Sequence, residues 1–139
     1  MRVTILLADH AQVANDKLYL LGGGWAFTGP QVAGPMGLAV LIEVPWDQAN
    51  RPHKLKLELQ DADGQLPLVP PANQPLVVEG DLEVGRPPGH PEGTPLNVPF
   101  ALNVPGLALP PGARYVWVLY IDGDTSPEWQ VAFNVRPLQ

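Results

Sequence analysis

The stretch RYVWVLYIDGDTSPEWQVAFNV, residues 114–135, decides the fold of this chain. Residues 115–121 are rich in β-branched and aromatic types, and they predict a strand. A polar connection follows at 122–128. The next seven residues alternate and predict a second strand, whose apolar side carries Trp129, Val131, Phe133 and Val135. Because an isolated hairpin is marginally stable in water, we expect another sheet to cover this one.

Outside this hairpin, six more segments have the composition or the alternation of strands. The alternation is clearest after His53, where Leu55, Leu57 and Leu59 share one side. Prolines and glycines separate the segments. The predicted strands cover residues 2–8, 17–28, 38–44, 53–60, 76–84, 98–104, 115–121 and 129–135. This spacing predicts an all-β fold, an antiparallel β-sandwich of immunoglobulin-like type, with a closed β-barrel as the alternative.

Glycines and short polar segments predict local features within this plan. Gly22–Gly24 interrupt the strand at 17–28, which indicates a bulge, or a bend by which the strand leaves one sheet for the other. Gly80 also indicates a bulge. Residues 10–14 suit a short helical turn, and residues 29–35 suit a turn. The proline-rich residues 65–75 suggest an irregular crossing at a sheet edge.

Composition and charge narrow the function classes. A length of 139 residues suits one domain, residues 1–139, with a core of its own. The chain has no cysteine, so disulfides, thiol catalysis and cysteine-based zinc sites are excluded. A net charge of −6 with eight scattered Lys and Arg residues argues against nucleic acids and anionic membranes as partners. No segment has the length of a membrane span or a signal peptide, and we expect a cytoplasmic protein.

Several motifs resemble those of an uncharacterised family of small bacterial β-sandwich proteins. They are LLADHAQV at 6–13, DKLYLLGGGW at 16–25, EVGRPPG at 83–89, and LPPG at 109–112 with IDG at 121–123. The resemblance covers nearly the whole chain, and KLYLLGGGW is its most specific part. It implies a free-standing small β-sandwich, and it brings no known activity with it. The C-terminal hairpin is also similar to the last hairpin of many immunoglobulin-like bacterial modules.

Strand parity groups the loops. If successive strands run antiparallel, the connections at 9–16, 45–53, 85–96 and 122–128 lie at one end, and those at 29–35, 61–75 and 105–113 lie at the other. The first end then holds all three histidines and several carboxylates, and imidazole with carboxylate suits zinc or another divalent ion. The candidate ligands are His10, His53, His90, Asp47 and Asp122. The simpler interpretation, which we favour, is solvated loops with turn-capping side chains.

No motif indicates catalysis. Residues 61–64 (DADG) and 122–124 (DGD) each match part of a calcium loop, but neither continues to the distal glutamate, and turn chemistry explains both. The only serine, Ser126, precedes a proline and lies in no nucleophile elbow. We therefore assign no catalytic residue and no cofactor, and we do not expect an enzyme.

These observations favour a non-enzymatic protein-interaction or assembly module; the alternative is a protein that binds a small ligand or a divalent metal with the loops at one end. Trp46 begins a polar loop, where a large aromatic side chain suits either a lid over the core or a recognition residue. Arg86 and His90 lie in the long loop at 86–95, which we expect its prolines to hold in extended, polyproline-like conformations. Together with Trp46 they are our candidate interaction residues. Self-association as a homodimer is also expected, because Val116, Val118 and Tyr120 give the strand at 115–121 a second apolar face.

Overall fold

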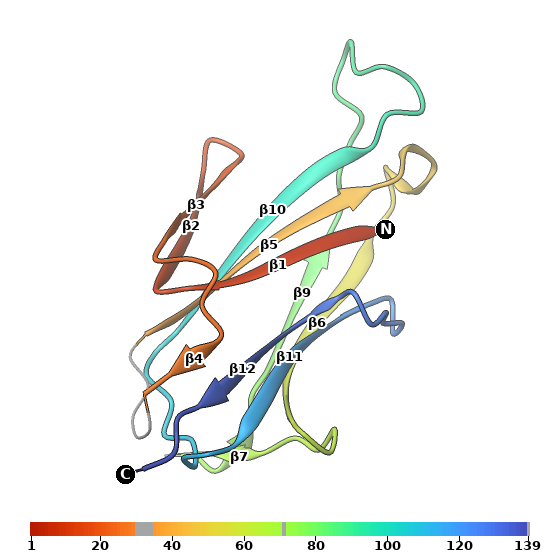
Figure 1. Ribbon diagram of the computed structural model, residues 1–139. Coiled ribbons are helices and arrows are strands. Elements are labelled where there is room, and N and C mark those ends of the chain that lie inside the picture. Colours follow the sequence, from red (N-terminus) through yellow and green to blue (C-terminus); the bar gives the residue numbers. More distant parts are fainter. Residues whose placement is uncertain (30–34, 71, 139) are drawn as a thin grey trace.

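Two packed β-sheets form the body of the protein in the computed structural model, which describes residues 1–29, 35–70 and 72–138 (Figure 1). The three-stranded sheet has the order β1 (Arg2–Ala8), β5 (Met36–Val44), β10 (Leu96–Val104). The five-stranded sheet has the order β4 (Phe27–Thr28), β12 (Gln130–Val135), β11 (Arg114–Ile121), β6 (His53–Asp61), β9 (Val77–Leu82). The all-β prediction is confirmed.

The connections give this sandwich an immunoglobulin-like topology. The hairpins β6–β9 and β11–β12 stay within the five-stranded sheet, whereas the chain changes sheet from β5 to β6, from β9 to β10 and from β10 to β11. All pairs within the two sheets are antiparallel except β4, which runs parallel to β12. β10 and β9 lie at sheet edges, so the sheets do not close into the barrel that we considered as the alternative.

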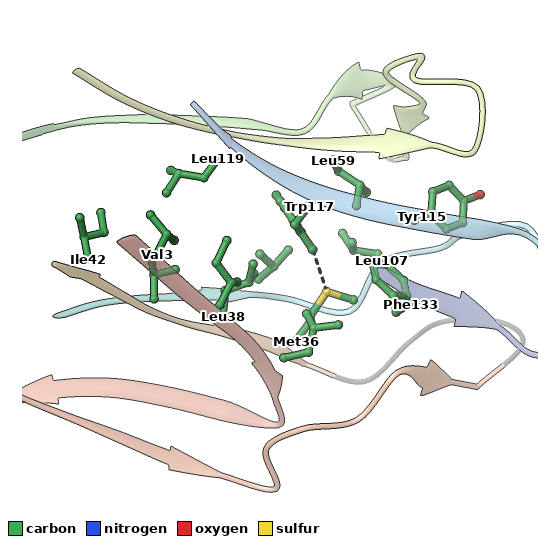
Figure 2. Close-up of a cluster of buried hydrophobic side chains, with 14 of the residues drawn as sticks. Val3, Met36, Leu38, Ile42, Leu59, Leu107, Tyr115, Trp117, Leu119 and Phe133 are labelled. Atoms are coloured by element: carbon green, nitrogen blue, oxygen red, sulfur yellow. Dashed lines mark hydrogen bonds between the residues drawn. The ribbon is translucent and has the colours of Figure 1, made fainter. Parts of the chain in front are cut away.

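The hairpin at 114–135 supplies the centre of the core. Trp117 of β11 is fully buried, and its indole N–H points at the sulfur of Met36 on β5, 3.3 Å away (Figure 2). Phe133 of β12 is also fully buried and lies 5.8 Å from the ring of Tyr115. Strands β5 and β11 correspond to the two strands that a disulfide joins across antibody domains. Here a tryptophan–methionine contact links them, in a chain without cysteine.

The second face of β11 is partly covered by the chain itself. Val118 on this face is only 5% exposed. The long side chains of β6 surround it: Lys56 pairs with Glu58 at 2.9 Å, and Gln60 donates to the hydroxyl of Tyr120 at 3.1 Å. Such side chains cover apolar surface with their aliphatic stems. Val116 and Tyr120 on the same face are half-buried, so the apolar face behind our homodimer expectation is partly covered within one chain, and the homodimer stays a prediction.

A two-stranded hairpin, β2 (His10–Ala14) and β3 (Lys17–Leu21), lies against the outer face of the three-stranded sheet. Its turn residues, Asn15 and Asp16, have φ of 51° and 58°, as a two-residue hairpin turn requires. The Asn103 side chain on β10 holds the hairpin, accepting from the Ala11 N–H at 3.0 Å and donating to the Ala11 carbonyl at 2.7 Å. The helical turn considered for residues 10–14 is therefore wrong.

Glycines create the space for this hairpin and for the turn after it. A Cβ on Gly37 of β5 would lie 2.9 Å from the nitrogen of Ala11. After β3, Gly22 has a φ of 62° and a Cβ there would overlap the Asp9 carboxylate. The chain then continues to β4 in the other sheet, as the predicted bend requires. The predicted strand at 17–28 is thus two strands, and most of the turn predicted at 29–35 lies outside the described residues.

Three smaller features complete the fold. A short 3₁₀ helix, η1 (Trp46–Gln48), follows β5. The stretch at 65–75 that we predicted as irregular contains two very short paired strands, β7 (Leu68–Val69) and β8 (Gln74–Pro75). Gly80 pairs with Leu55 in regular register, so the predicted bulge is wrong. In the part of the chain that the structure describes, no helix is long and apolar enough to cross a membrane.

Candidate functional site

Three loops and the N-terminus gather at one end of the sandwich (Figure 1). The loops are residues 45–52, 83–95 and 122–129, which follow or precede antiparallel strands of the two sheets. The parity prediction was correct for these loops. It was wrong for residues 9–16, because β1 pairs directly with β5 and Ala8 lies opposite Gly37. His10 therefore lies at the other end of the sandwich. The parity argument failed here because it counted residues 17–28 as one strand that crosses the sandwich, and they do not cross it.

A buried histidine, His53, contacts the exposed Asp122 at this end. His53 is 5% exposed, and its Nδ1 lies 2.7 Å from Oδ2 of Asp122. The Nε2 of the same ring lies 3.0 Å from the carbonyl oxygen of Gln48. Asp122 also accepts from the backbone N–H of Lys54 at 2.8 Å. The contact joins β6, the 3₁₀ turn and the β11–β12 loop, and both ring nitrogens face an acceptor.

This arrangement fixes the protonation preferences of the pair. Burial lowers the pKa of His53, but the hydrogen bonds with Gln48 and Asp122 outweigh it, so the pKa of His53 is raised above its ordinary value. The hydrogen bonds from His53 and from the Lys54 N–H lower the pKa of Asp122. A histidine with both nitrogens engaged has no free lone pair for a substrate proton or a metal ion. The pair therefore holds loops together.

The other predicted metal ligands do not join this pair. His90 stacks on Trp46, and its Nε2 lies 3.0 Å from the carbonyl oxygen of Thr94. Asp47 is exposed on the 3₁₀ turn. Within residues 1–29, 35–70 and 72–138, no three His, Asp or Glu side chains are grouped as a metal site requires.

The sequence DADG at 61–64 makes a turn. Oδ1 of Asp61 accepts from the backbone N–H groups of Asp63 and Gln65, each at 2.9 Å. Its own N–H donates to the carbonyl oxygen of Gln65 at 2.8 Å. These bonds close the β6 strand end, as the turn interpretation requires.

Arg86 and His90 both contact Trp46 at the loop end. The imidazole of His90 stacks on the Trp46 ring with 5.8 Å between centroids and 7° between planes. The guanidinium carbon of Arg86 lies 4.3 Å from the centre of the same ring. Arg86 also donates from Nε and Nη2 to the Trp46 carbonyl oxygen, at 3.2 and 2.6 Å. We call these three residues the Trp46 cluster.

Two turns shape the loop that carries Arg86 and His90. The His90 N–H donates to the Pro87 carbonyl at 3.0 Å, and Gly89 between them has a φ of 80°. Residues 91–94 repeat this pattern, with a 3.2 Å bond from Thr94 to Pro91 and a φ of 82° at Gly93. Both have the signature of a type II turn. The extended, polyproline-like loop that we expected is therefore wrong: the prolines stiffen two successive turns.

An open pocket of about 570 Å³ lies beside the Trp46 cluster. Trp46 and the backbone of the turns form part of its wall, and an ion pair between Arg2 and Glu43, at 3.1 Å, lies at its edge. Its lining residues are Met1, Arg2, Glu43, Pro45, Trp46, Asp47, Gly93 and Pro95. Our sequence interpretation did not include Arg2 and Glu43. The pairing of Arg2 on β1 with Glu43 on β5 is the signal that could have identified this pocket. That strand register follows only from the fold.

This chain belongs to DUF6941, a family of unknown function whose model matches residues 3–136. The match confirms the resemblance to an uncharacterised family. No curated protein and no solved structure matches the chain.

Proposed function

We propose that this member of DUF6941 is a non-enzymatic interaction module that binds a partner protein with the Trp46 cluster and the adjoining pocket. The observation that carries the proposal is a half-buried tryptophan at a loop end, with its ring in contact with both an arginine and a histidine. Tryptophan and arginine are the residues most often responsible for binding energy at protein interfaces. A lid over the core needs the tryptophan alone; the arginine and the open pocket beside it add a means of recognition.

The cluster is ordered before any partner arrives. Arg86 is fixed by two hydrogen bonds to a backbone oxygen, and His90 by its own ring contact and the two turns. A side chain already held in its bound position loses less conformational freedom on association. The Trp46 cluster therefore meets the condition for a strong anchor on a small surface.

The chemistry of the same end supports binding over catalysis. The buried imidazole of His53 has both nitrogens engaged, so it offers no general base. A carboxylate, Asp47, and the Arg2–Glu43 pair surround the pocket with both signs of charge. Such a mixed polar rim around an apolar and aromatic centre is usual for protein interfaces.

The partner in this proposal is another protein or a second copy of the chain, in the cytoplasm of a bacterium. Nothing in a chain without cysteine needs an oxidising compartment. Because side chains of β6 partly cover the second face of β11, a dimer in this proposal uses the loop end instead. Native mass spectrometry of the purified protein distinguishes the two kinds of partner.

Replacing Trp46 with alanine should remove partner binding. A tagged wild-type protein is used to capture partners from the native host, and the captured partner is purified and titrated against variants. Loss of an anchoring tryptophan weakens binding by about 2 kcal/mol or more, roughly thirtyfold. We expect Arg86→Ala and His90→Ala to weaken it in the same direction, because each orients the Trp46 ring.

The matched control is Phe27→Ala. Phe27 is 56% exposed on β4, and the guanidinium carbon of Arg136 lies 5.9 Å from its ring, so it repeats the aromatic–arginine arrangement away from the loop end. It should leave the dissociation constant unchanged within about twofold. Thermal melts establish that each variant is folded. Equal binding by wild-type protein and Trp46→Ala would contradict the proposal.

A further inference from the structure

One flank of the sandwich is open. β9 and β10 are the edge strands of the two sheets, and the 83–95 loop connects them. Side chains that point inward along this flank are only half-buried, unlike the fully buried Leu38, Trp117 and Phe133 at the centre. The half-buried inward positions are Leu55, Leu57, Val78, Val98, Phe100 and Leu102. The core is therefore covered less completely between β9 and β10 than elsewhere.

The open flank contains an apolar groove of about 210 Å³. Val40, Ile42 and Leu119 of the core lie along it, together with inward side chains of β6 and β10. Its polar boundary is the β9 segment Glu79–Gly80–Asp81. A side chain entering here would contact the core directly.

Gly80 keeps this groove open. It pairs with Leu55 in regular register, so its missing side chain would lie on the inner row with Val78 and Leu82. No heavy atom lies within 4 Å of where its Cβ would be. Glycine inside a strand sacrifices packing, and it often marks a place where a ligand or another backbone approaches closely. Neither a bulge nor a positive φ accounts for glycine at this position.

The backbone beside the groove is suited to pairing. Among the described residues β9 pairs with β6 along one edge, and no strand pairs with its other edge. A strand edge of this kind is a template for an added strand, whose alternate side chains then point to the same face as Val78 and Gly80. β10, at the other side, contains Pro99, which has no N–H to donate. β9 is the better template.

The charges on β9 favour one kind of incoming segment. Glu79 and Asp81 are exposed on the outer row of β9, and Glu83 follows it. Lys54 pairs with Asp81 at 2.7 Å, whereas the described ion pairs do not include Glu79. A second copy of β9 would bring these acidic side chains against their own kind, and like charges on paired strands destabilise the pairing. A basic segment would be attracted.

We propose that an extended segment of a partner protein, with apolar residues alternating with Lys or Arg, adds to the free edge of β9. One apolar side chain of the segment fills the space above Gly80 and enters the groove. Its basic side chains lie beside Glu79 and Asp81. This strand-addition site is separate from the Trp46 cluster, so it does not depend on the function proposed above.

The test uses a synthetic eight-residue peptide in which lysine alternates with valine and leucine. We expect saturable binding, with new hydrogen-exchange protection of the alternate β9 amides that face the free edge, those of Val77, Glu79 and Asp81, because pairing buries their N–H groups. A peptide with glutamate in place of lysine should bind at least about tenfold more weakly. Decyltrimethylammonium serves as a small apolar cation for comparison. If it binds in the groove without protecting the β9 amides, and the peptide does not bind, the groove is a small-molecule site and strand addition is overturned.

Gly80→Val provides the decisive variant. Valine suits a strand, and the space at Gly80 accepts it, so the variant should fold at least as stably as the wild type. The variant should nevertheless bind the lysine peptide about tenfold or more weakly, because the valine side chain occupies the space for the incoming residue. Trp46→Ala should bind the peptide like the wild type, which separates this site from the loop end. No peptide binding, or equal binding by Gly80→Val, would overturn the proposal.

Discussion

Replacing Trp117 with alanine should lower the free energy of unfolding by about 3–5 kcal/mol, the usual cost of removing a buried aromatic side chain. Trp117 is fully buried and links the two sheets through its contact with Met36 (Figure 2). Most of a tryptophan volume would be left empty, and the strands around it cannot close over that space. Because a domain of this size has a total stability of about 5–15 kcal/mol, the variant should be close to unfolding at ambient temperature.

Urea denaturation followed by far-UV circular dichroism measures this effect, since the remaining tryptophans complicate fluorescence. Phe27→Ala is the control, because an exposed aromatic side chain should change the stability by at most about 0.5 kcal/mol. A loss below about 1.5 kcal/mol for Trp117→Ala would mean that the core repacks. The two sheets would then be held together by contacts other than those of the central hairpin.

The alternation of apolar residues predicted the sandwich well, because burial on one face of a sheet imposes a period of two. The strands β6 and β12 follow from it directly, whereas β11, which is apolar on both faces, followed from its β-branched and aromatic composition. The hairpin β2–β3 was missed for a physical reason: its strands have five residues each and lie on the outside of a sheet, so their side chains need little burial. Its turn, Asn15–Asp16, is a better signal than its strands, since both residues tolerate positive φ.

The residues of the candidate site could be predicted from their types, but the contacts between them could not. Trp46, Arg86 and His90 were selected one by one, for an aromatic in a polar loop and for a stiff segment; the stacking between residues 44 positions apart follows from the fold. His53 and Asp122 were chosen as metal ligands, yet each satisfies the other across 69 positions. A sequence gives the donors and acceptors, whereas the fold decides which of them meet.

The His53–Asp122 contact should make stability depend on pH. The pKa of His53 is raised by its hydrogen bonds with Gln48 and Asp122, which outweigh burial, so folding favours the protonated ring. That contribution is fully present below the unfolded pKa of about 6.5, and it is lost as the pH rises through the folded pKa. The pKa of Asp122 is lowered, so its contribution is present above about pH 4 and is lost as the pH falls through the folded pKa.

Two variants isolate this contact. Asp122→Asn removes the negative charge and keeps a residue that accepts the positive φ of 52° at this position. Asp81→Asn removes a carboxylate from an exposed pair with Lys54, and such pairs add little to stability. Comparing the two separates the buried histidine contact from the general effect of one lost charge.

At pH 6, Asp122→Asn should lower the free energy of unfolding by about 1–3 kcal/mol, the cost of leaving a buried polar group without its charged partner. The loss should shrink above the raised pKa of His53, because neutral imidazole needs the carboxylate less. Urea melts at half-unit pH steps from 5 to 9 measure both effects in Asp122→Asn, in the wild type and in Asp81→Asn. The plots of unfolding free energy against pH should run parallel for the wild type and Asp81→Asn. If Asp122→Asn keeps the wild-type slope over this range, the Asp122 carboxylate does not raise the pKa of His53, and the 2.7 Å contact does not favour the protonated ring.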